Sequence, residues 1–204
     1  MERLEKIKLA VSSILRMLLI IAAVTSVFLD DWMNLFLSLF TLFLTFLPAI
    51  IERKYKVSYT NEFGIILLLF IALSMYLGEI HSFYYIFWWW DIFLHAISSI
   101  VIGGIGFLLV HTLNKEKDVE LKLSPAFVAV FSLGFSISLG VIWEIFEFSM
   151  DSLFGLNMQK SGLIDTMWDL IIYVLGALVV SWFGFIYLKK DRRWLDKIKG
   201  RFIE

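Results

Sequence analysis

The sequence contains no cysteine, and only two prolines occur among its 204 residues. Without cysteine the protein can form neither a disulfide bond nor a metal site with thiolate ligands. Pro48 and Pro125 each lie near an end of an apolar segment, so neither interrupts the middle of one. The groups left for metal chemistry are therefore carboxylates and imidazoles.

Apolar residues, in contrast, make up 60% of the chain, and the mean hydropathy is +0.83. Soluble domains contain about 45–50% apolar residues. The excess falls in segments of roughly 20 residues, the length that a helix needs to cross a hydrocarbon core of about 30 Å. The sequence thus predicts an all-α integral membrane protein, a bundle of six transmembrane helices forming a single domain over residues 1–204. The expected spans are residues 9–29, 32–51, 63–79, 84–111, 125–149 and 165–188.

Basic residues alternate along the connections between these spans. Lysine and arginine are frequent at the N-terminus, near residue 54, near residue 117 and in the C-terminal tail. The connections near residues 30 and 80 have none, and the last connection has only Lys160. By the positive-inside rule, both termini are expected in the cytoplasm (N-in, C-in), in the inner or cytoplasmic membrane of a cell. Arg16 lies within the first span, and its charge is expected to extend toward the nearer surface.

Ionisable side chains recur at helical spacing in the last three spans. In the stretch WWWDIFLHAIS, residues 88–98, Asp91 and His95 are four residues apart and share one helix face. The next two spans carry carboxylates at similar spacing: Glu144, Glu147 and Asp151 in one, Asp165 and Asp169 in the other. With the predicted directions, all of these side chains lie in the outer half of the membrane. We therefore expect them to converge in one cavity that opens outward.

A cluster of this kind needs compensation for its charge. An ionised carboxylate deep in a span costs about 2.5–3.5 kcal/mol even on the milder insertion scale, so protons, a bound cation or water must accompany the acids. Carboxylates with one imidazole suit a divalent metal ion such as Mg²⁺, Mn²⁺, Fe²⁺ or Zn²⁺. The expected ligands are Asp91, His95, Glu144, Glu147, Asp165 and Asp169, and the expected residues around them are Ser98, Asp151, Asn157, Gln159 and Tyr173.

Two other interpretations of the acids stay open. A single intramembrane Asp or His can simply form a hydrogen bond with a neighbouring helix, and protons can neutralise the acids in place of a metal. In favour of a cation, the acceptors far outnumber the donors, since Lys160 is the only basic residue nearby. A di-iron bundle requires two Glu-x-x-His pairs, and the sequence has none.

The strings DIFLH, WEIFEF and NMQKSGLIDTMWDLIIYVLGA resemble the YjdF-type family of bacterial inner-membrane proteins, which has no established biochemical function. That pattern has Asp-x-x-x-His in one span, Glu-x-x-Glu in the next, and a Gln-containing loop before Asp-x-x-x-Asp and Gly-Ala. The matching residues here are Asp91, His95, Glu144, Glu147, Gln159, Asp165, Asp169 and Gly176. Many members carry another Asp or Asn where this sequence has Tyr173. A weaker similarity links the same order of residues to the VanZ-like membrane proteins.

Three functions fit these observations. The first is a metal-dependent enzyme at the outer leaflet, acting on a lipid-linked phosphate with water activated by the metal. The second is a transporter of a divalent cation or of protons, for which six spans would require a homodimer. The third is a membrane scaffold or sensor. The expected partners are the lipid bilayer and a lipid or small ion, and no nucleic acid is expected.

Overall fold

The computed structural model describes residues 3–55, 60–113 and 123–190. These residues form helices and turns, with no strand among them. Six helical segments in this part of the chain are long and apolar enough to cross a membrane, which confirms the predicted fold class. They are Arg3–Phe28, Trp32–Lys54, Asn61–Ile80, Trp90–Leu113, Pro125–Phe154 and Leu163–Lys189. The chain divides into two compact units, with the boundary between Trp90 and Asp91, and whether they act as one domain stays a prediction.

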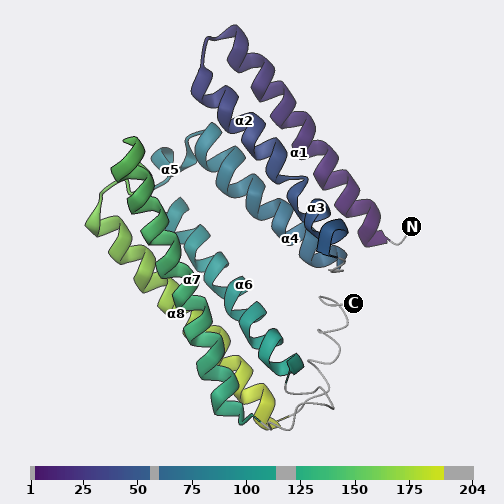
Figure 1. The fold of residues 1–204 in the computed structure, drawn as a ribbon, viewed down its shortest axis with the longest axis vertical. Helices are drawn as coiled ribbons and strands as arrows, with labels where there is room; N and C mark the ends of the chain where they lie inside the picture. The colour runs from purple at the N-terminus through teal and green to yellow at the C-terminus, as the bar shows by residue number, and fades with distance from the viewer. Residues whose placement is uncertain (1–2, 56–59, 114–122, 191–204) are drawn as a thin grey trace. The chain divides into compact units, whose positions relative to one another are not determined.

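The first unit contains six helical elements, of which α1, α2 and α4 lie side by side (Figure 1). Asp31 and Thr60 begin α2 and α4, because their side chains accept hydrogen bonds from the backbone N–H of Asn34 and Phe63. Near the end of the unit a π-helix, η1, follows α4 directly. The bounds are α1 Arg3–Phe28, α2 Trp32–Leu44, α3 Leu47–Tyr55, α4 Asn61–Ile71, η1 Ala72–Ile80 and α5 Phe83–Ile86.

The second span is broken into α2 and α3 at Thr45 and Phe46. Pro48 explains the break, because its nitrogen has no hydrogen to donate to the carbonyl four residues earlier. Arg16 of α1 donates to the Thr45 hydroxyl and to the Thr45 carbonyl, both at 3.0 Å, and lies 3.8 Å from the centre of the Phe46 ring. The side chain of Arg16 thus binds this turn, whereas the sequence predicted that it would extend toward the membrane surface.

The fourth span begins later than predicted. Residues 84–111 were expected to form one helix, but α5 ends at Ile86, Phe87 is extended (φ −118°, ψ 105°), and α6 spans Trp90–Leu113. The aromatic rings of this segment pack against one another, with Phe83 5.0 Å from both Phe87 and Trp90 between ring centres. The Trp90 indole also donates to the carbonyl of Leu73 at 3.3 Å. These contacts favour the break, and Asp91 consequently lies in the first turn of α6.

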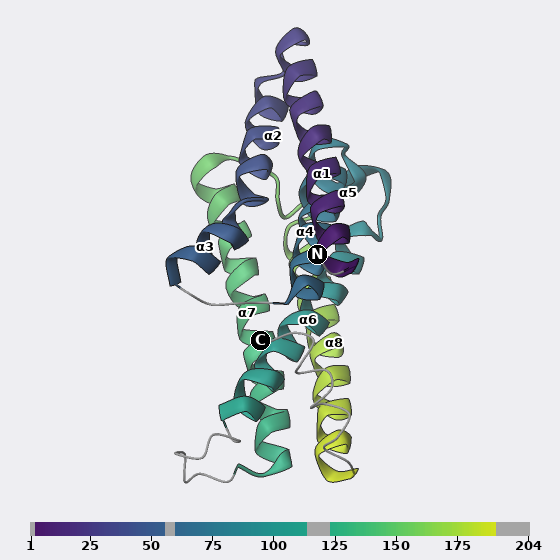
Figure 2. The same cartoon turned by 90° about the vertical axis from the view of Figure 1, so that its right-hand side faces the viewer.

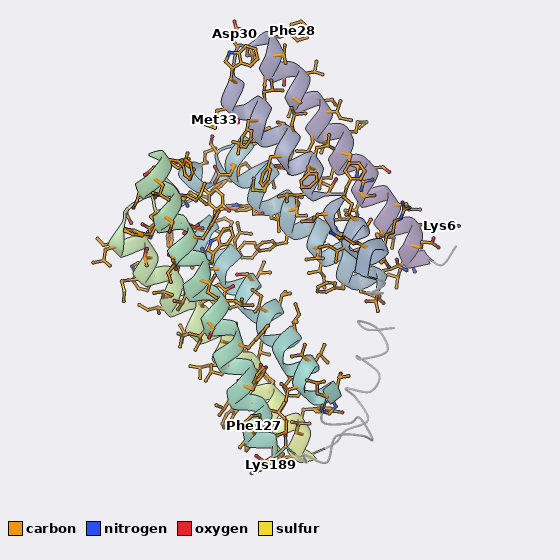
Figure 3. The ribbon with its side chains drawn as sticks, in the orientation of Figure 1. Lys6, Phe28, Asp30, Met33, Phe127 and Lys189 are labelled. Carbon is orange, nitrogen blue, oxygen red and sulfur yellow. The ribbon has the colours of Figure 1, made fainter. Side chains whose placement is uncertain are left out.

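The second unit consists of α6, α7 (Pro125–Phe154) and α8 (Leu163–Lys190). Figures 1 and 2 show α7 and α8 as a long antiparallel pair. In Figure 3, Phe127 and Lys189 mark the end of the unit where α7 begins and α8 finishes. The acidic residues of α7 lie toward its other end, close to the start of α8, which places the acids of both helices together.

Glycines allow these three helices to approach closely. A Cβ on Gly140 of α7 would lie 2.6 Å from Cδ1 of Tyr173 on α8, and one on Gly106 of α6 would lie 2.7 Å from the Phe135 ring. Gly176 of α8 is in direct contact with Ser99 of α6, and its lack of a side chain allows this close packing. Buried serines add hydrogen bonds from hydroxyl groups of one helix to carbonyl groups of another: Ser132 to Gly103, Ser136 to Ser99 and Ser181 to Ala129.

Candidate metal centre

The loop between α7 and α8 is held in a defined conformation by its own polar groups. The Asp151 carboxylate accepts hydrogen bonds from the backbone N–H of Met158 at 2.7 Å and of Gln159 at 2.8 Å. The Gln159 amide donates to the Thr166 hydroxyl at 2.6 Å. Gly155 and Gly162 adopt positive φ angles of 66° and 63°, which glycine reaches without the steric penalty of a side chain. Together these contacts fix the segment that carries Lys160.

Lys160 extends from this loop to α6, where its Nζ lies 2.6 Å from Oδ2 of Asp91. Both side chains are largely buried: 20% of the Lys160 side chain and 16% of the Asp91 side chain are exposed. Asp91 is in the first turn of α6, where the unpaired N–H groups and the helix dipole favour a negative charge. The negative charge of Asp91 is therefore compensated from two sides.

His95 is the centre of the cluster, because its ring lies among acids from all three helices. Its Nε2 is 3.5 Å from Oδ1 of Asp91 and 3.9 Å from Oδ1 of Asp169 on α8. Its Nδ1 is 3.9 Å from Oε1 of Glu144 on α7. The Tyr173 ring meets the imidazole edge-on, with 5.9 Å between the ring centres. The two nitrogens of one imidazole thus face different carboxyl groups.

Several polar atoms in this cluster are buried without a hydrogen-bond partner in the described part of the chain. They are Nδ1 of His95, both carboxylate oxygens of Glu144, and Oδ2 of Asp169. The three residues are 5%, 5% and 2% exposed. A buried polar atom that lacks a partner loses its hydration without compensation, at roughly 1–3 kcal/mol each. Such atoms around one point indicate a place where a ligand or ion would be stabilised.

Two sets of side chains have ligand atoms close enough together to hold a metal ion. Asp91, His95 and Asp169 form one set, and His95, Glu144 and Glu147 form the other. Within each set the ligand atoms lie within 4.8 Å of one another. Glu147 is oriented by Trp143, whose indole N–H donates to its Oε1 at 3.0 Å. The two sets share His95 and together contain four carboxyl groups.

The structure therefore brings together five of the six residues predicted as ligands. The sixth, Asp165, is half-buried in the first turn of α8 and belongs to neither set. Helix periodicity is sufficient to find the five, because each of the three helices places its acids or its histidine on one face.

The residues predicted to surround the site have different roles. Tyr173 contacts His95, while Ser98 donates to the backbone carbonyl of His95 at 3.0 Å. Asp151 and Gln159 build the loop, and Asn157 is exposed on it. The sequence did not predict the contacts of Lys160 with Asp91 or of Trp143 with Glu147. Trp143 lies four residues before Glu147 on the same helix, and this spacing would have been enough to find the second contact.

Helices of transmembrane length and a buried cluster of acids around one histidine define a multi-pass membrane protein with a polar centre in its second unit. Residues 8–190 match the family described as "Predicted membrane protein (DUF2238)", and the chain belongs to this family. It is similar to an uncharacterised protein of Thermotoga maritima, with 32% identity over 124 residues. That match covers 61% of this chain and 61% of the relative, so less than two thirds of either. No solved structure matches the chain.

Proposed function

We propose that the cluster around His95 is a binding site for a divalent metal ion and that this ion is central to the protein's function. The observation that carries the proposal is the set of unpartnered buried atoms on His95, Glu144 and Asp169. These three residues come from three different helices, and each of the two acids lies within 3.9 Å of the imidazole. A cation bound among them would satisfy a nitrogen and several oxygens at once.

A network held together by protons alone fits this arrangement less well. A protonated carboxyl group is a hydrogen-bond donor, and in a buried network it would be expected to point at an acceptor. Among the described residues, neither oxygen of Glu144 is directed at an acceptor; the groups that act on this carboxyl group are the His95 imidazole and the Thr166 hydroxyl. The combination of imidazole nitrogen and carboxylate oxygens favours Mn²⁺, Fe²⁺ or Zn²⁺ over Mg²⁺, which binds oxygen ligands and retains its water.

Between the cluster and the opposite end of the unit, the helices are closely packed. This packing favours a site that is closed on that side and disfavours an ion path through the unit. Tyr173 lies against Gly140, Ser99 against Gly176 and Phe107 against Gly184, so that side chains fill the space between the helices. The buried hydroxyl groups of Ser132, Ser136 and Ser181 already donate hydrogen bonds to backbone carbonyl groups, so they do not line an open path for an ion. We therefore favour a metal-dependent enzyme that acts on a lipid-linked substrate, in which the ion would polarise an oxygen of the substrate or activate water. Transport of the ion itself is the alternative.

Metal analysis of the purified full chain tests the proposal. After exposure to Mn²⁺ and removal of free ions, the wild-type protein is expected to retain bound metal, and Glu144→Gln, which removes a charged ligand, is expected to retain less. Asp30→Asn is the matched control, because Asp30 is exposed on the α1–α2 connection and Asn also tolerates its positive φ of 55°. Equal metal content in all three proteins, or no bound metal in the wild type, would contradict the proposal.

Flux measurements separate the enzyme from the transporter. Protein reconstituted in liposomes should bind Mn²⁺ without moving it into the lumen if the site is closed on one side. Accumulation of the ion inside the liposomes, lost in Glu144→Gln and retained in Asp30→Asn, would favour transport.

A further inference from the structure

The cluster has two halves that differ in how their charge is compensated. One half contains Asp91 and Asp169 and faces Nε2 of His95, and Lys160 supplies a positive charge to it. The other half contains Glu144 and Glu147 and faces Nδ1 of His95. No lysine or arginine is paired with Glu144 or Glu147 in the described part of the chain; their polar neighbours include the neutral Trp143 indole, the Thr166 hydroxyl and the imidazole.

We propose, on the basis of the metal site proposed above, that the ion binds to His95, Glu144 and Glu147, and that Lys160 acts as a tethered cation occupying the other half. In this arrangement the protein holds one ion, and Lys160 prevents a second ion from binding between Asp91 and Asp169. The lysine then determines the number of ions in a site that otherwise has ligands for two.

The unpartnered atoms support this assignment of the halves. Of the four unpartnered atoms that the described residues contribute to the cluster, Nδ1 of His95 and both oxygens of Glu144 belong to the half without a fixed cation. The fourth, Oδ2 of Asp169, belongs to the half that Lys160 occupies. In the other half, Asp91 has Lys160 at 2.6 Å and the imidazole Nε2 at 3.5 Å. Because a neutral imidazole has one N–H and one lone pair, an Nε2–H directed at Asp91 leaves the Nδ1 lone pair available for a metal. A carboxylate behind a metal-binding histidine commonly fixes the tautomer in this way.

The loop is built to hold Lys160 in this position. Asp151 accepts two backbone hydrogen bonds from the two residues immediately before Lys160, so the backbone that leads to Lys160 is fixed at the end of α7. The lysine is thus part of a defined structure that spans from α7 to α6. Without its charge, Asp91 and Asp169 would form a second pair of acids, on the other side of the imidazole from the first ion.

The test compares the number of Mn²⁺ ions bound per chain in the wild type, Lys160→Met and Lys160→Arg. The expected result is one ion in the wild type and in Lys160→Arg, which keeps the positive charge, and two ions in Lys160→Met. Electron paramagnetic resonance provides a second measurement, since two Mn²⁺ ions on opposite sides of one imidazole broaden each other's signal by spin–spin coupling and a single ion gives the unbroadened signal. One ion in a folded Lys160→Met, or two in the wild type, would overturn the inference and leave the proposed metal site intact. No ion in the wild type would refute both.

A second pair of variants tests the assignment even if Lys160→Met does not fold. Glu144→Gln removes a charged ligand of the ion and is expected to weaken Mn²⁺ binding by at least about 100-fold. Asp91→Asn changes only a residue behind the ligand and is expected to weaken binding by about 10-fold, the lower end for such positions. The opposite order, with Asp91→Asn the more damaging variant, would place the ion in the half with Lys160 and overturn the inference.

Discussion

His95 shows how one side chain can organise the acids of three helices. Its imidazole lies within 3.9 Å of Asp91, Glu144 and Asp169, which come from α6, α7 and α8. It is 5% exposed, so it must find polar partners inside the unit. Its position between the acids makes it the one group that both halves of the cluster require.

Replacement of His95 by Gln is therefore expected to weaken metal binding more than any single change outside the cluster. Glutamine is polar and of similar length, but it lacks the imidazole nitrogen that suits Mn²⁺, Fe²⁺ and Zn²⁺. Titration calorimetry with Mn²⁺ should show affinity lowered by at least about 10-fold, which corresponds to about 1.4 kcal/mol. His81→Gln, in the turn after η1, is the control and should bind Mn²⁺ with the same affinity as the wild type. Unchanged affinity in His95→Gln would exclude the histidine as a ligand.

The sequence was sufficient to place most of the candidate site because helix periodicity brings residues four apart onto one face. The sequence was not sufficient to predict that Lys160 contacts Asp91. The contact of Lys160 with Asp91 depends on the path of a loop, and that path is set by hydrogen bonds from the loop backbone to Asp151. A loop has no periodicity from which such a path can be predicted. Asp165 shares its helix face with Asp169 and yet belongs to neither ligand set, so periodicity identifies the face of α8 but not which of its acids comes close to His95.

At the scale of the elements, hydropathy and length predicted the six helical spans, and local packing determined where two of them break. Pro48 marks the break between α2 and α3 in the sequence, but the contact of Arg16 with Thr45 depends on a neighbouring helix. The break before α6 results from aromatic rings that pack on one another and on η1. Hydropathy does not distinguish these residues from the rest of an apolar span.

The close approach of α7 and α8 gives a prediction at this scale. The Cβ added by Gly140→Ala would lie 2.6 Å from the Tyr173 ring, so this ring, which also contacts His95, must move away from residue 140. Overpacking of this kind typically costs about 1–3 kcal/mol. Thermal unfolding in detergent should show a lower melting temperature for Gly140→Ala. Gly134→Ala, on the same helix with no atom within 4 Å of the added Cβ, should show no loss. Equal melting temperatures would contradict the observed helix contact.

At the scale of the whole molecule, the alternation of basic residues makes a prediction about orientation. Both termini and the connections near residues 54 and 117 are expected in the cytoplasm, although residue 117 lies outside the described residues. Because the chain has no cysteine, single cysteines can be introduced without background. An impermeant thiol reagent on intact cells should label cysteine at Asp30 or Asn157 and should not label cysteine at Lys54 or Lys117. Labelling at Lys117 would contradict this orientation.

The effect of a chelator on thermal stability tests the central claim most directly, because an ion bound only by the folded protein stabilises it by mass action. At a free Mn²⁺ concentration of 100 times the dissociation constant, the stabilisation is about 2.7 kcal/mol. The melting temperature of the purified protein should fall when a chelator is added and recover with Mn²⁺, and the change should be smaller in Glu144→Gln than in Asp30→Asn. If protons neutralise the buried acids instead, the chelator will have no effect. Stability would then be greatest at low pH and would decrease as rising pH forces buried carboxyl groups to ionise, and that result would contradict the metal site.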